Sequence, residues 1–342
     1  MRVLFVGFGN VGRKIAEILF LEKDKFPYLA LNDLTITGIF TRTKGVLVDN
    51  AGIDVPKALY EFGNYGKFNP SNPQWSNMNV SEAIEKGEYD ILVELSTLSI
   101  TNRGEPAISF IHDALRYGKH VVTANKGPVA FAYKELAKHA KKNKCYFLHE
   151  ATVMDGAPVF NMKERTLKGC KVTGLSGILN STTNFILSRM EKGESFQSAL
   201  NIAQQEGFAE ADPAHDIEGW DSAAKIAVLA NAMMGAEITP LDVTRKGISD
   251  ISVQTIKETL KKGSALKLIC RAWKENRRVL ARVELEEIPA SDPFFKVGGN
   301  GACLRIETDL MSPLLIFQES PTLYDTAFGV IEDIQTICLS EH

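Results

Sequence analysis

An acidic segment from Glu206 to Lys225 holds the residue types best suited to chemistry in this chain. Its carboxylates are Glu206, Glu210, Asp212, Asp216, Glu218 and Asp221. Glycine and proline interrupt the segment, so most of these carboxylates are expected on a loop. Asp221 and Lys225 stand four residues apart at the start of an apolar run, and a helix would place both on one face. This arrangement would hold a cationic substrate beside a proton donor. The simpler interpretation is a solvated acidic loop with a surface ion pair.

A glycine-rich motif near the N-terminus indicates a dinucleotide site. Residues 3–6 form an apolar run expected as a strand, residues 7–12 read Gly-Phe-Gly-Asn-Val-Gly, and a helix is expected over residues 13–21. The first glycine permits a tight turn, the second lets the backbone approach a pyrophosphate, and the third allows close helix packing. Phosphates would bind the free N–H groups of the helix N-terminus. The expected cofactor-binding residues are Gly7, Gly9, Asn10, Val11 and Gly12. The alternative is a glycine-rich turn with a purely structural role.

The end of the second expected strand, residues 35–40, bears on which dinucleotide binds. An acid there usually contacts the ribose hydroxyl of NAD, whereas an arginine accommodates the 2′-phosphate of NADP. The chain continues Thr-Arg-Thr-Lys and has no acid before Asp49. We therefore expect NADP(H) to be preferred over NAD(H), with Arg42 and Lys44 at the 2′-phosphate. The alternative is that both are ordinary loop charges.

Expected strands and helices alternate through the first part of the chain. Strands are expected at 90–95, 120–123 and 145–148, with helices at 106–117 and 131–143. This alternation predicts an α/β fold with a Rossmann-type, doubly wound parallel sheet. Ligands of such sheets lie outside the carboxyl ends of the strands. Thr97 and Lys126 follow two of these strands, so we expect both to face the nicotinamide end of a cofactor.

The pattern changes after residue 148. Strands are expected at 171–179, 265–274, 279–288 and 303–308, and helices at 183–192, 195–206 and 222–234. Elements of one kind grouped in blocks predict an α+β domain. We therefore expect a dinucleotide-binding domain over residues 1–149 and a substrate domain over 150–318. A C-terminal segment, residues 319–342, would pack back on the first domain through a helix.

Composition argues against several other classes of protein. The 342 residues suffice for two domains, and the net charge of −3 favours neither nucleic acid nor an anionic membrane as partner. The cysteines and histidines show no metal-ligand spacing, which suits a reducing compartment with free thiols. No apolar run reaches membrane-spanning length, and a strand rather than a signal peptide is expected at the start. We expect a cytoplasmic protein that acts on a small molecule.

The motifs resemble the homoserine dehydrogenase family over nearly the whole chain. The matching segments are residues 7–12, 123–126 (Thr-Ala-Asn-Lys), 150–153 (Glu-Ala-Thr-Val), 176–180 (Ser-Gly-Ile-Leu-Asn) and 207–213 (Gly-Phe-Ala-Glu-Ala-Asp-Pro), continuing through Asp216, Gly219, Asp221 and Lys225. The resemblance implies NAD(P)-dependent interconversion of L-aspartate 4-semialdehyde and L-homoserine, a step of threonine, methionine and isoleucine biosynthesis. It also implies a homodimer built through the substrate domain, which would then be a dimerisation domain as well.

The resemblance also implies roles for individual residues. The implied catalytic residues are Lys225, Lys126 and Asp221. The implied substrate-binding residues are Glu210, Asp216, Thr182 and Phe208. Hydride transfer to an aldehyde leaves an alkoxide, and a nearby lysine would stabilise that charge and donate a proton. Lys225 would take this role, with Lys126 reaching the same site from the nucleotide domain, while Glu210 and Asp216 would bind the substrate ammonium.

Members of the family also bind a monovalent cation in a loop after the last strand of the nucleotide domain. By resemblance, the ligands of Na⁺ or K⁺ would be Glu150, Val153, Asp155 and Ala157. Backbone carbonyls and one carboxylate suit a hard cation. The alternative is that residues 150–157 form a plain interdomain hinge.

Three positions depart from the family pattern. Ser181 stands where glycine is usual, and Phe208 stands where tyrosine is common. Residues 319–325, Glu-Ser-Pro-Thr-Leu-Tyr-Asp, replace a glycine-rich loop that approaches the nicotinamide side of the cofactor. These differences leave open a non-catalytic descendant that binds a nucleotide or an amino acid, or a related oxidoreductase for another amino-acid aldehyde. Because the chain ends at His342, we expect no C-terminal regulatory domain and no feedback inhibition by threonine through one.

Overall fold

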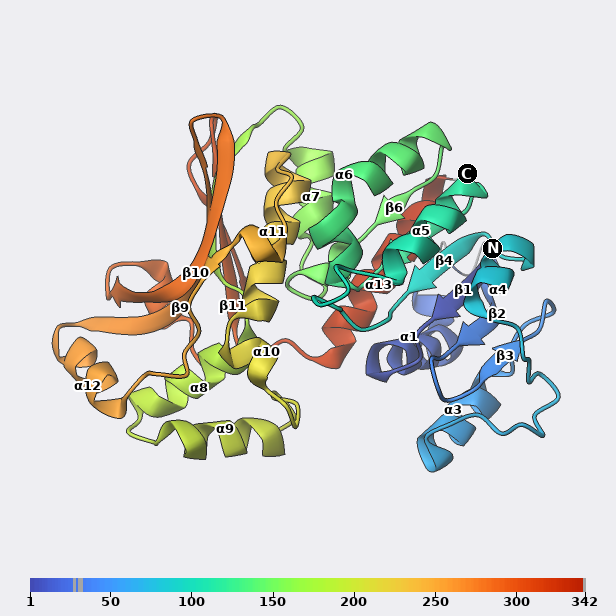
Figure 1. The fold of residues 1–342 in the computed structure, drawn as a ribbon, viewed down its shortest axis with the longest axis horizontal. Coiled ribbons are helices and arrows are strands. Elements are labelled where there is room, and N and C mark those ends of the chain that lie inside the picture. The colour runs from blue at the N-terminus through green and yellow to red at the C-terminus, as the bar shows by residue number, and fades with distance from the viewer. Residues whose placement is uncertain (27–28, 30–32, 341–342) are drawn as a thin grey trace. The chain divides into compact units, whose positions relative to one another are not determined.

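Each of two units of the chain is built around one six-stranded sheet (Figure 1). The computed structural model describes residues 1–26, 29 and 33–340. The first unit comprises Met1–Pro158 and Thr322–His342, and the second comprises Val159–Pro321. The expected boundaries after residues 149 and 318 therefore lie too early. Residues 150–158 stay with the first unit because hydrogen bonds tie them to its C-terminal helix.

The sheet of the first unit has the strand order β3-β2-β1-β4-β5-β6. Its strands are β1 (Arg2–Val6), β2 (Thr35–Phe40), β3 (Val46–Val48), β4 (Ile91–Glu94), β5 (His120–Thr123) and β6 (Phe147–Leu148). Neighbouring strands pair in parallel, except that β3 runs antiparallel to β2. The α/β class and the doubly wound sheet are confirmed, and the antiparallel edge strand is an addition that the sequence did not predict.

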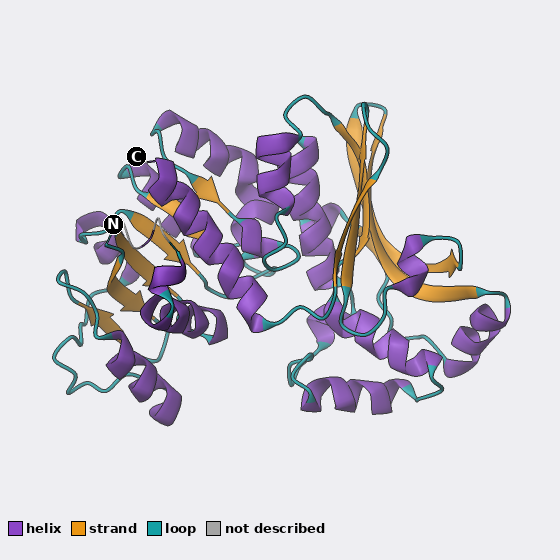
Figure 2. Ribbon diagram, turned by 180° about the vertical axis from the view of Figure 1, so that it is seen from behind, coloured by secondary structure: helices purple, strands orange, loops and turns teal. Residues whose placement is uncertain are grey.

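Helices cover both faces of this sheet (Figure 2). They are α1 (Asn10–Leu21), α3 (Val55–Tyr65), α4 (Val80–Lys86), α5 (Ala107–Arg116), α6 (Lys126–Lys142) and α13 (Leu323–Ser340), with short 3-10 turns η1 (Lys23–Lys25) and η2 (Glu150–Thr152). Val3 and Phe5 of β1 enter one core with α1, α3 and α13, as expected for side chains two residues apart on a strand. Helix α13 returns to the first unit and fills this core with Val330, Ile331 and Ile334, each fully buried.

Helix α6 begins earlier than residue 131, where the sequence predicted it. The side chain of Asn125 accepts a hydrogen bond from the backbone N–H of Gly127 and caps the helix, so that Lys126 is its first residue. Ala132 has a non-helical backbone (φ −141°, ψ 18°), which interrupts the helix close to the predicted start. The periodic pattern therefore marked only the part of α6 beyond this interruption.

The sheet of the second unit is mainly antiparallel, with the order β12-β11-β7-β9-β10-β8. Its strands are β7 (Val172–Ile178), β8 (Thr244–Arg245), β9 (Ser264–Glu275), β10 (Arg278–Pro289), β11 (Ala302–Thr308) and β12 (Leu314–Gln318). Its helices are α7 (Val159–Thr166), α8 (Ser181–Glu191), α9 (Phe196–Gln205), α10 (Ala214–Ile217), α11 (Trp220–Met234) and α12 (Val253–Lys261), with 3-10 turns η3 (Pro240–Asp242) and η4 (Pro293–Lys296). Helix α11 packs along one face of the sheet against β7, β9 and β10 (Figure 1). The expected α+β architecture is confirmed. None of the helices described in either unit has the length and apolarity needed to cross a membrane.

Candidate active site

The glycine-rich loop between β1 and α1 leaves room for a ligand at the start of the helix. Gly7 has a φ of 107°, and a Cβ there would lie 2.6 Å from the carbonyl oxygen of Leu95. A Cβ on Gly12 would lie 2.9 Å from the carbonyl oxygen of Gly7, so neither position tolerates a side chain. Gly9, by contrast, has no described atom within 4 Å of its Cβ position, and no described side chain caps α1. The first N–H groups of α1 are therefore available to phosphate oxygens.

Arg42 and Lys44 lie in a tight turn that follows β2. The hydroxyl of Thr41 donates to the carbonyl oxygen of Gly45 at 2.7 Å and accepts from the backbone N–H of Lys44 at 2.8 Å. Gly45 packs so closely on Trp75 that a Cβ would lie 2.4 Å from the indole. Both basic side chains are exposed. The turn thus presents two positive charges at the strand end where the adenosine ribose of a dinucleotide is expected.

A buried carboxylate joins the carboxyl ends of β4 and β5. Glu94 accepts from the backbone N–H of Ser96 at 2.8 Å and from the hydroxyl of Thr123 at 2.9 Å. The amide of Asn125 donates to the hydroxyl of Ser96 at 3.3 Å, and its backbone N–H donates to Thr123 at 3.0 Å. Burial raises the pKa of the Glu94 carboxyl above its ordinary value. This closed ring of hydrogen bonds positions the first turn of α6 and therefore Lys126.

The acidic segment of the second unit contributes to a compact polar cluster at the start of α8. The amide of Asn180 donates to Asp216 at 2.7 Å and to Asp221 at 3.0 Å. The hydroxyl of Thr182 donates to the other carboxylate oxygen of Asp216 at 2.8 Å and also lies 2.7 Å from the carbonyl oxygen of Phe208. Asn180 and Thr182 are both buried. Residues far apart in the sequence thus surround the Asp216 carboxylate.

Lys225 extends this polar cluster from helix α11. The helix starts at Trp220, directly after Gly219, whose left-handed backbone (φ 82°) suits glycine, and so includes both Asp221 and Lys225. The ammonium of Lys225 lies 3.0 Å from a carboxylate oxygen of Asp221 and donates to the carbonyl oxygen of Leu179 at 2.7 Å. The helical spacing predicted for these two residues is confirmed. The side chain of Lys225 is mostly buried, because the rest of the helix is apolar and packed.

The environment of Asp216 opposes its ionisation. Burial raises the pKa of this carboxyl, and the negative charge of Asp221 raises it further. The hydrogen bonds from Asn180 and Thr182 and the positive charge of Lys225 act in the opposite direction. A cation placed beside Asp216 would relieve the repulsion between the two carboxylates, so the cluster is suited to an ammonium group.

Glu210 and Phe208, two of the predicted substrate-binding residues, make no side-chain hydrogen bond to the polar cluster around Asp216 within the described residues. Glu210 is exposed on the acidic loop, and within the described residues its carboxylate makes no hydrogen bond to the cluster. Phe208 contributes its backbone carbonyl, while its ring packs against Phe185 with 4.9 Å between centroids. Thr97, predicted at the cofactor, is exposed three residues beyond the end of β4.

The predicted cation loop lies wholly within the first unit. Met154 and Asp155 have left-handed backbones, with φ values of 58° and 54°. A carboxylate oxygen of Asp155 accepts from the hydroxyl of Thr326 at 2.7 Å, and the backbone N–H of Glu150 donates to Asp333 at 2.8 Å. Both partners belong to α13, so hydrogen bonds hold the loop against that helix. Among the described residues, no group of three or more acidic, histidine or cysteine side chains converges as metal ligands.

The segment that replaces the glycine-rich loop folds into the start of α13. Asp325 accepts from the backbone N–H of Thr322 at 2.8 Å and from its hydroxyl at 2.7 Å. The ring centroid of Tyr324 lies 4.4 Å from the ammonium of Lys14 on α1. The tyrosine therefore lies alongside the helix whose N-terminus faces the expected phosphates.

Family models match both parts of the chain. The model for homoserine dehydrogenase matches residues 158–335, and the model for the NAD binding domain of homoserine dehydrogenase matches residues 7–150. A homoserine dehydrogenase of Methanocaldococcus jannaschii is 37% identical, with 98% of this chain and 97% of that protein covered. The chain belongs to the homoserine dehydrogenase family.

Two further homoserine dehydrogenases differ in the cofactor that their names give. The NAD(+)-dependent homoserine dehydrogenase of Pseudomonas canavaninivorans is 32% identical, with 97% of this chain and 95% of that protein covered. A hyperthermophilic archaeal homoserine dehydrogenase in complex with NADPH superposes with a TM-score of 0.82 at 26% identity, covering 99% of this chain and 98% of the other. Family membership therefore establishes an oxidoreductase with a nicotinamide dinucleotide, and the choice between NAD and NADP depends on residues of this chain.

Two polar residues of this homoserine dehydrogenase were not predicted as part of the site. Asn180 links Asp216 to Asp221, and Glu94 links the ends of β4 and β5. Asn180 could have been found from its position, because an asparagine between a strand and a helix is a common helix cap. Glu94 could have been found as an acid at the end of a buried apolar strand.

Proposed function

We propose that this homoserine dehydrogenase reduces L-aspartate 4-semialdehyde to L-homoserine with Lys225 as the proton donor, and that Lys225 accepts the proton in the reverse reaction. The observation that carries the proposal is the ammonium of Lys225 held by the Leu179 carbonyl and the Asp221 carboxylate at 2.7 and 3.0 Å. These contacts orient the ammonium toward the polar cluster of Asn180, Thr182, Asp216 and Asp221, here called the Asp216 cluster. NADPH, when bound, supplies the hydride. The alkoxide that forms takes its proton from Lys225, and the ammonium stabilises the negative charge as it develops.

The Asp216 cluster would hold the α-ammonium group of the substrate. Each oxygen of Asp216 accepts one hydrogen bond, from Asn180 or Thr182, and each retains capacity for a second. Asp221 would orient the substrate or a water molecule through its contacts with Asn180 and Lys225. Glu210 is proposed to add a second carboxylate to the ammonium, and Phe208 to line the site. In the first unit, Lys126 and Thr97 are proposed to serve the nicotinamide end of the cofactor.

The function is tested by the homoserine-dependent rise in reduced-cofactor absorbance, with NADP⁺ and NAD⁺ compared in parallel. We expect a rise with both dinucleotides and a larger kcat/KM with NADP⁺, because Arg42 and Lys44 stand where an acid would select NAD. Arg42→Asp is expected to reverse this preference, since a carboxylate repels a 2′-phosphate and accepts from a ribose hydroxyl. An unchanged ratio of the two kcat/KM values in Arg42→Asp would contradict the assignment. A folded protein without turnover would instead favour the non-catalytic descendant.

The loop over residues 150–157 is proposed to bind Na⁺ or K⁺ through Glu150, Val153, Asp155 and Ala157. Its support is the pair of left-handed residues that turn the backbone, and the carboxylate that Asp155 contributes. We expect saturable activation when NaCl or KCl replaces tetramethylammonium chloride at constant ionic strength. Asp155→Ala is expected to shift the activation to higher cation concentration. Equal rates in all three salts would remove the cation site.

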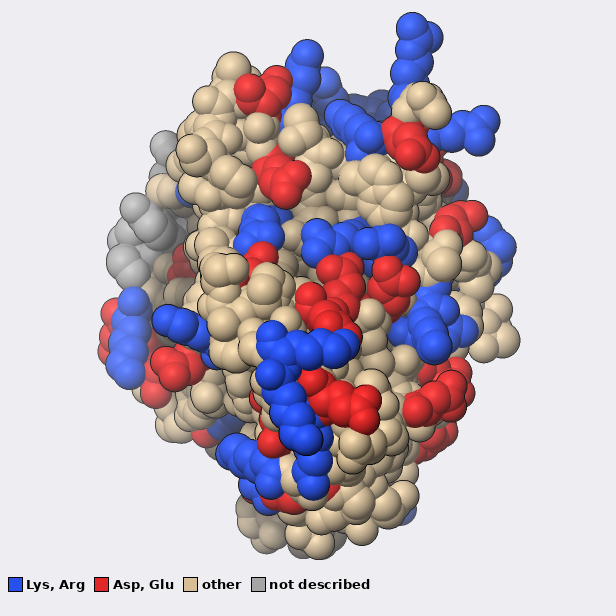
Figure 3. Space-filling model, turned by 90° about the vertical axis from the view of Figure 1, so that its left-hand side faces the viewer, with Lys and Arg blue, Asp and Glu red and all other residues tan. Residues whose placement is uncertain are grey.

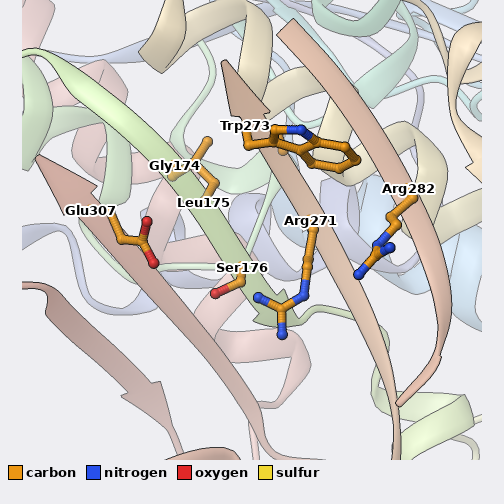
Figure 4. A pocket seen from close by; sticks show the side chains of 8 residues that line it. Gly174, Leu175, Ser176, Arg271, Trp273, Arg282 and Glu307 are labelled. Carbon is orange, nitrogen blue, oxygen red and sulfur yellow. The ribbon is translucent and has the colours of Figure 1, made fainter. Parts of the chain in front are cut away.

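The open face of the second sheet is proposed to form a homodimer. Leu280 on β10 and Phe317 on β12 are exposed apolar side chains. Figure 3 views the side where β9 and β10 lie and shows basic and acidic side chains intermixed. A shallow cavity of about 300 Å³ opens between β7, β9, β10 and β11 (Figure 4). There the carboxylate of Glu307 points toward the hydroxyl of Ser176, which is buried without a hydrogen-bond partner among the described residues. A second copy would cover these groups through a two-fold interface.

The dimer is tested by sedimentation equilibrium. We expect twice the mass of the chain for the wild-type protein and a monomer for the double variant Leu280→Glu and Phe317→Glu, because paired carboxylates on both copies would repel each other. Tyr60→Glu is the matched control, since Tyr60 is 61% exposed on α3 of the first unit. A double variant that remains dimeric would exclude this face as the interface.

The cytoplasm is proposed as the location of the enzyme. All five cysteines are free thiols in the structure, which is what a reducing compartment maintains.

A further inference from the structure

Two cationic side chains from separate elements meet at one aromatic ring. Arg13 lies on α1, one residue after the glycine-rich motif, and Lys44 lies in the turn after β2. The guanidinium carbon of Arg13 and the ammonium nitrogen of Lys44 are each 5.6 Å from the ring centroid of Phe62. Both geometries are within the range of a cation–π interaction. The ring therefore brings Arg13 to the side of α1 that faces the turn after β2.

Packing fixes the position of that ring. Phe62 is 9% exposed, and its ring centroid lies 5.5 Å from that of Phe8 and 5.4 Å from that of Phe68. Phe8 belongs to the glycine-rich loop itself. The backbone N–H of Phe68 donates to the carbonyl oxygen of Lys44 at 2.9 Å. One aromatic cluster thus connects the phosphate-binding loop, helix α3 and the turn that carries Lys44.

The charges of Arg13 and Lys44 have no carboxylate partner within the described part of the chain. Arg13 donates one hydrogen bond, from Nη2 to the side-chain oxygen of Asn10 at 2.7 Å, and its buried Nε has no partner in the described structure. A guanidinium has five N–H donors, so most of its capacity remains for a ligand. Two cations without a carboxylate partner and with unused hydrogen-bond donors form a suitable binding site for an anion.

We infer that Arg13 is a further specificity-determining residue, which holds the 2′-phosphate of NADP(H) together with Lys44. The pyrophosphate binds the backbone at the start of α1, whereas the end of β2 receives the adenosine ribose. Arg13 shares its ring with Lys44, which lies beyond β2, and its side chain is therefore placed on the ribose side of the motif. The inference rests on the proposed preference for NADP(H). It adds Arg13 to Arg42 and Lys44, which were assigned from their position after the end of β2.

The test measures binding to the intact protein by calorimetry with two probes. Adenosine 2′,5′-bisphosphate carries the 2′-phosphate, and adenosine 5′-monophosphate lacks it. Arg13→Met keeps the aliphatic stem and removes the charge. We expect the bisphosphate to bind about tenfold to a hundredfold more weakly to Arg13→Met, as for loss of a charge-assisted hydrogen bond, with the monophosphate changed less than about twofold.

Lys14→Met is the matched control, because it removes one positive charge from the next position of the same helix. The ammonium of Lys14 is 2.7 Å from Glu17 and lies over Tyr324, away from Phe62. We expect this variant to bind both probes as the wild type does. Equal weakening of both probes by Arg13→Met, or no weakening, would overturn the inference. A wild-type protein that binds the two probes equally would instead contradict the NADP(H) preference itself.

Discussion

Lys225→Ala is expected to abolish turnover while leaving NADP⁺ binding intact. The substitution removes the group that donates the proton and the positive charge that stabilises the alkoxide. Each effect is worth about 10²-fold or more, so together kcat should fall by about 10⁴-fold. The residues proposed to bind the cofactor lie in the first unit and do not include Lys225, so the NADP⁺ dissociation constant should stay within about twofold. Steady-state homoserine oxidation and NADP⁺ calorimetry on the same preparation measure the two quantities.

One companion variant separates the proton from the charge, and a second serves as a control. Lys225→Arg keeps a cation beside Asp221, but a guanidinium does not give up its proton in proteins, so this variant should also be nearly inactive. Lys192→Ala removes an exposed lysine at the end of α8 and should behave as wild type. If Lys225→Ala retained a tenth of the wild-type kcat, Lys225 would not be the proton donor.

Asp216→Asn is expected to weaken homoserine binding by about tenfold to a hundredfold, with a smaller effect on kcat. The amide can replace the carboxylate without leaving a buried hydrogen-bond donor or acceptor unpaired, because its oxygen accepts from Asn180 and its NH₂ donates to the hydroxyl of Thr182. That hydroxyl still has the carbonyl oxygen of Phe208 as its acceptor. Only the charge that binds the ammonium is lost. Asp212→Asn, on the exposed part of the same loop, is the control and should leave KM unchanged.

The pH dependence of Asp216 gives this prediction a second measurement. Because burial and then Asp221 raise the pKa of its carboxyl, the ionised form is lost at a higher pH than for an ordinary aspartate. Homoserine affinity should therefore decline as the pH falls through that raised pKa, and Asp216→Asn should lack this decline.

The pKa of Asp216 is higher in the folded than in the unfolded protein. Ionised Asp216 therefore destabilises the fold above the folded-state pKa and has no effect below the unfolded-state pKa. Asp216→Asn should thus raise the free energy of unfolding at neutral pH, and the gain should vanish as the pH is lowered. Urea denaturation at several pH values measures it.

Features that depend on neighbouring residues were predictable from the sequence. The separation of Asp221 and Lys225 by four residues needs only a helix to bring them together, and the observed distance is 3.0 Å. The requirement for glycine at Gly7 and Gly12 follows from a strand that turns directly into a helix, and close backbone contacts occur at both positions. Local spacing was therefore a sufficient guide to the phosphate loop and to the lysine of the cluster.

Features that depend on distant residues were not predictable in the same way. Asn180 meets Asp216 and Asp221 only because β7 ends where the acidic loop passes, and no periodicity records that contact. The same limit explains Arg13, whose proximity to Lys44 depends on an aromatic cluster drawn from α3 and two loops. Strand β12, only five residues long with alternately half-buried and exposed side chains, has too weak a pattern to distinguish it from a loop. In each case, only folding brings together residues that are far apart in the sequence.

The return of α13 to the first unit has a consequence for how the protein is made. Its residues Ala327, Val330 and Ile331 are fully buried in a core whose buried members outside α13 run from Val3 to Ala151 and are therefore synthesised before the second unit. A ribosome adds about 5–20 residues per second, so residues 159–321 separate the two halves of that core by on the order of ten seconds. During this interval the nascent first unit exposes the apolar surface that α13 will cover, while the second unit, continuous in sequence, is completed first. Complete burial of that core therefore waits until α13 has been synthesised, after the whole of the second unit.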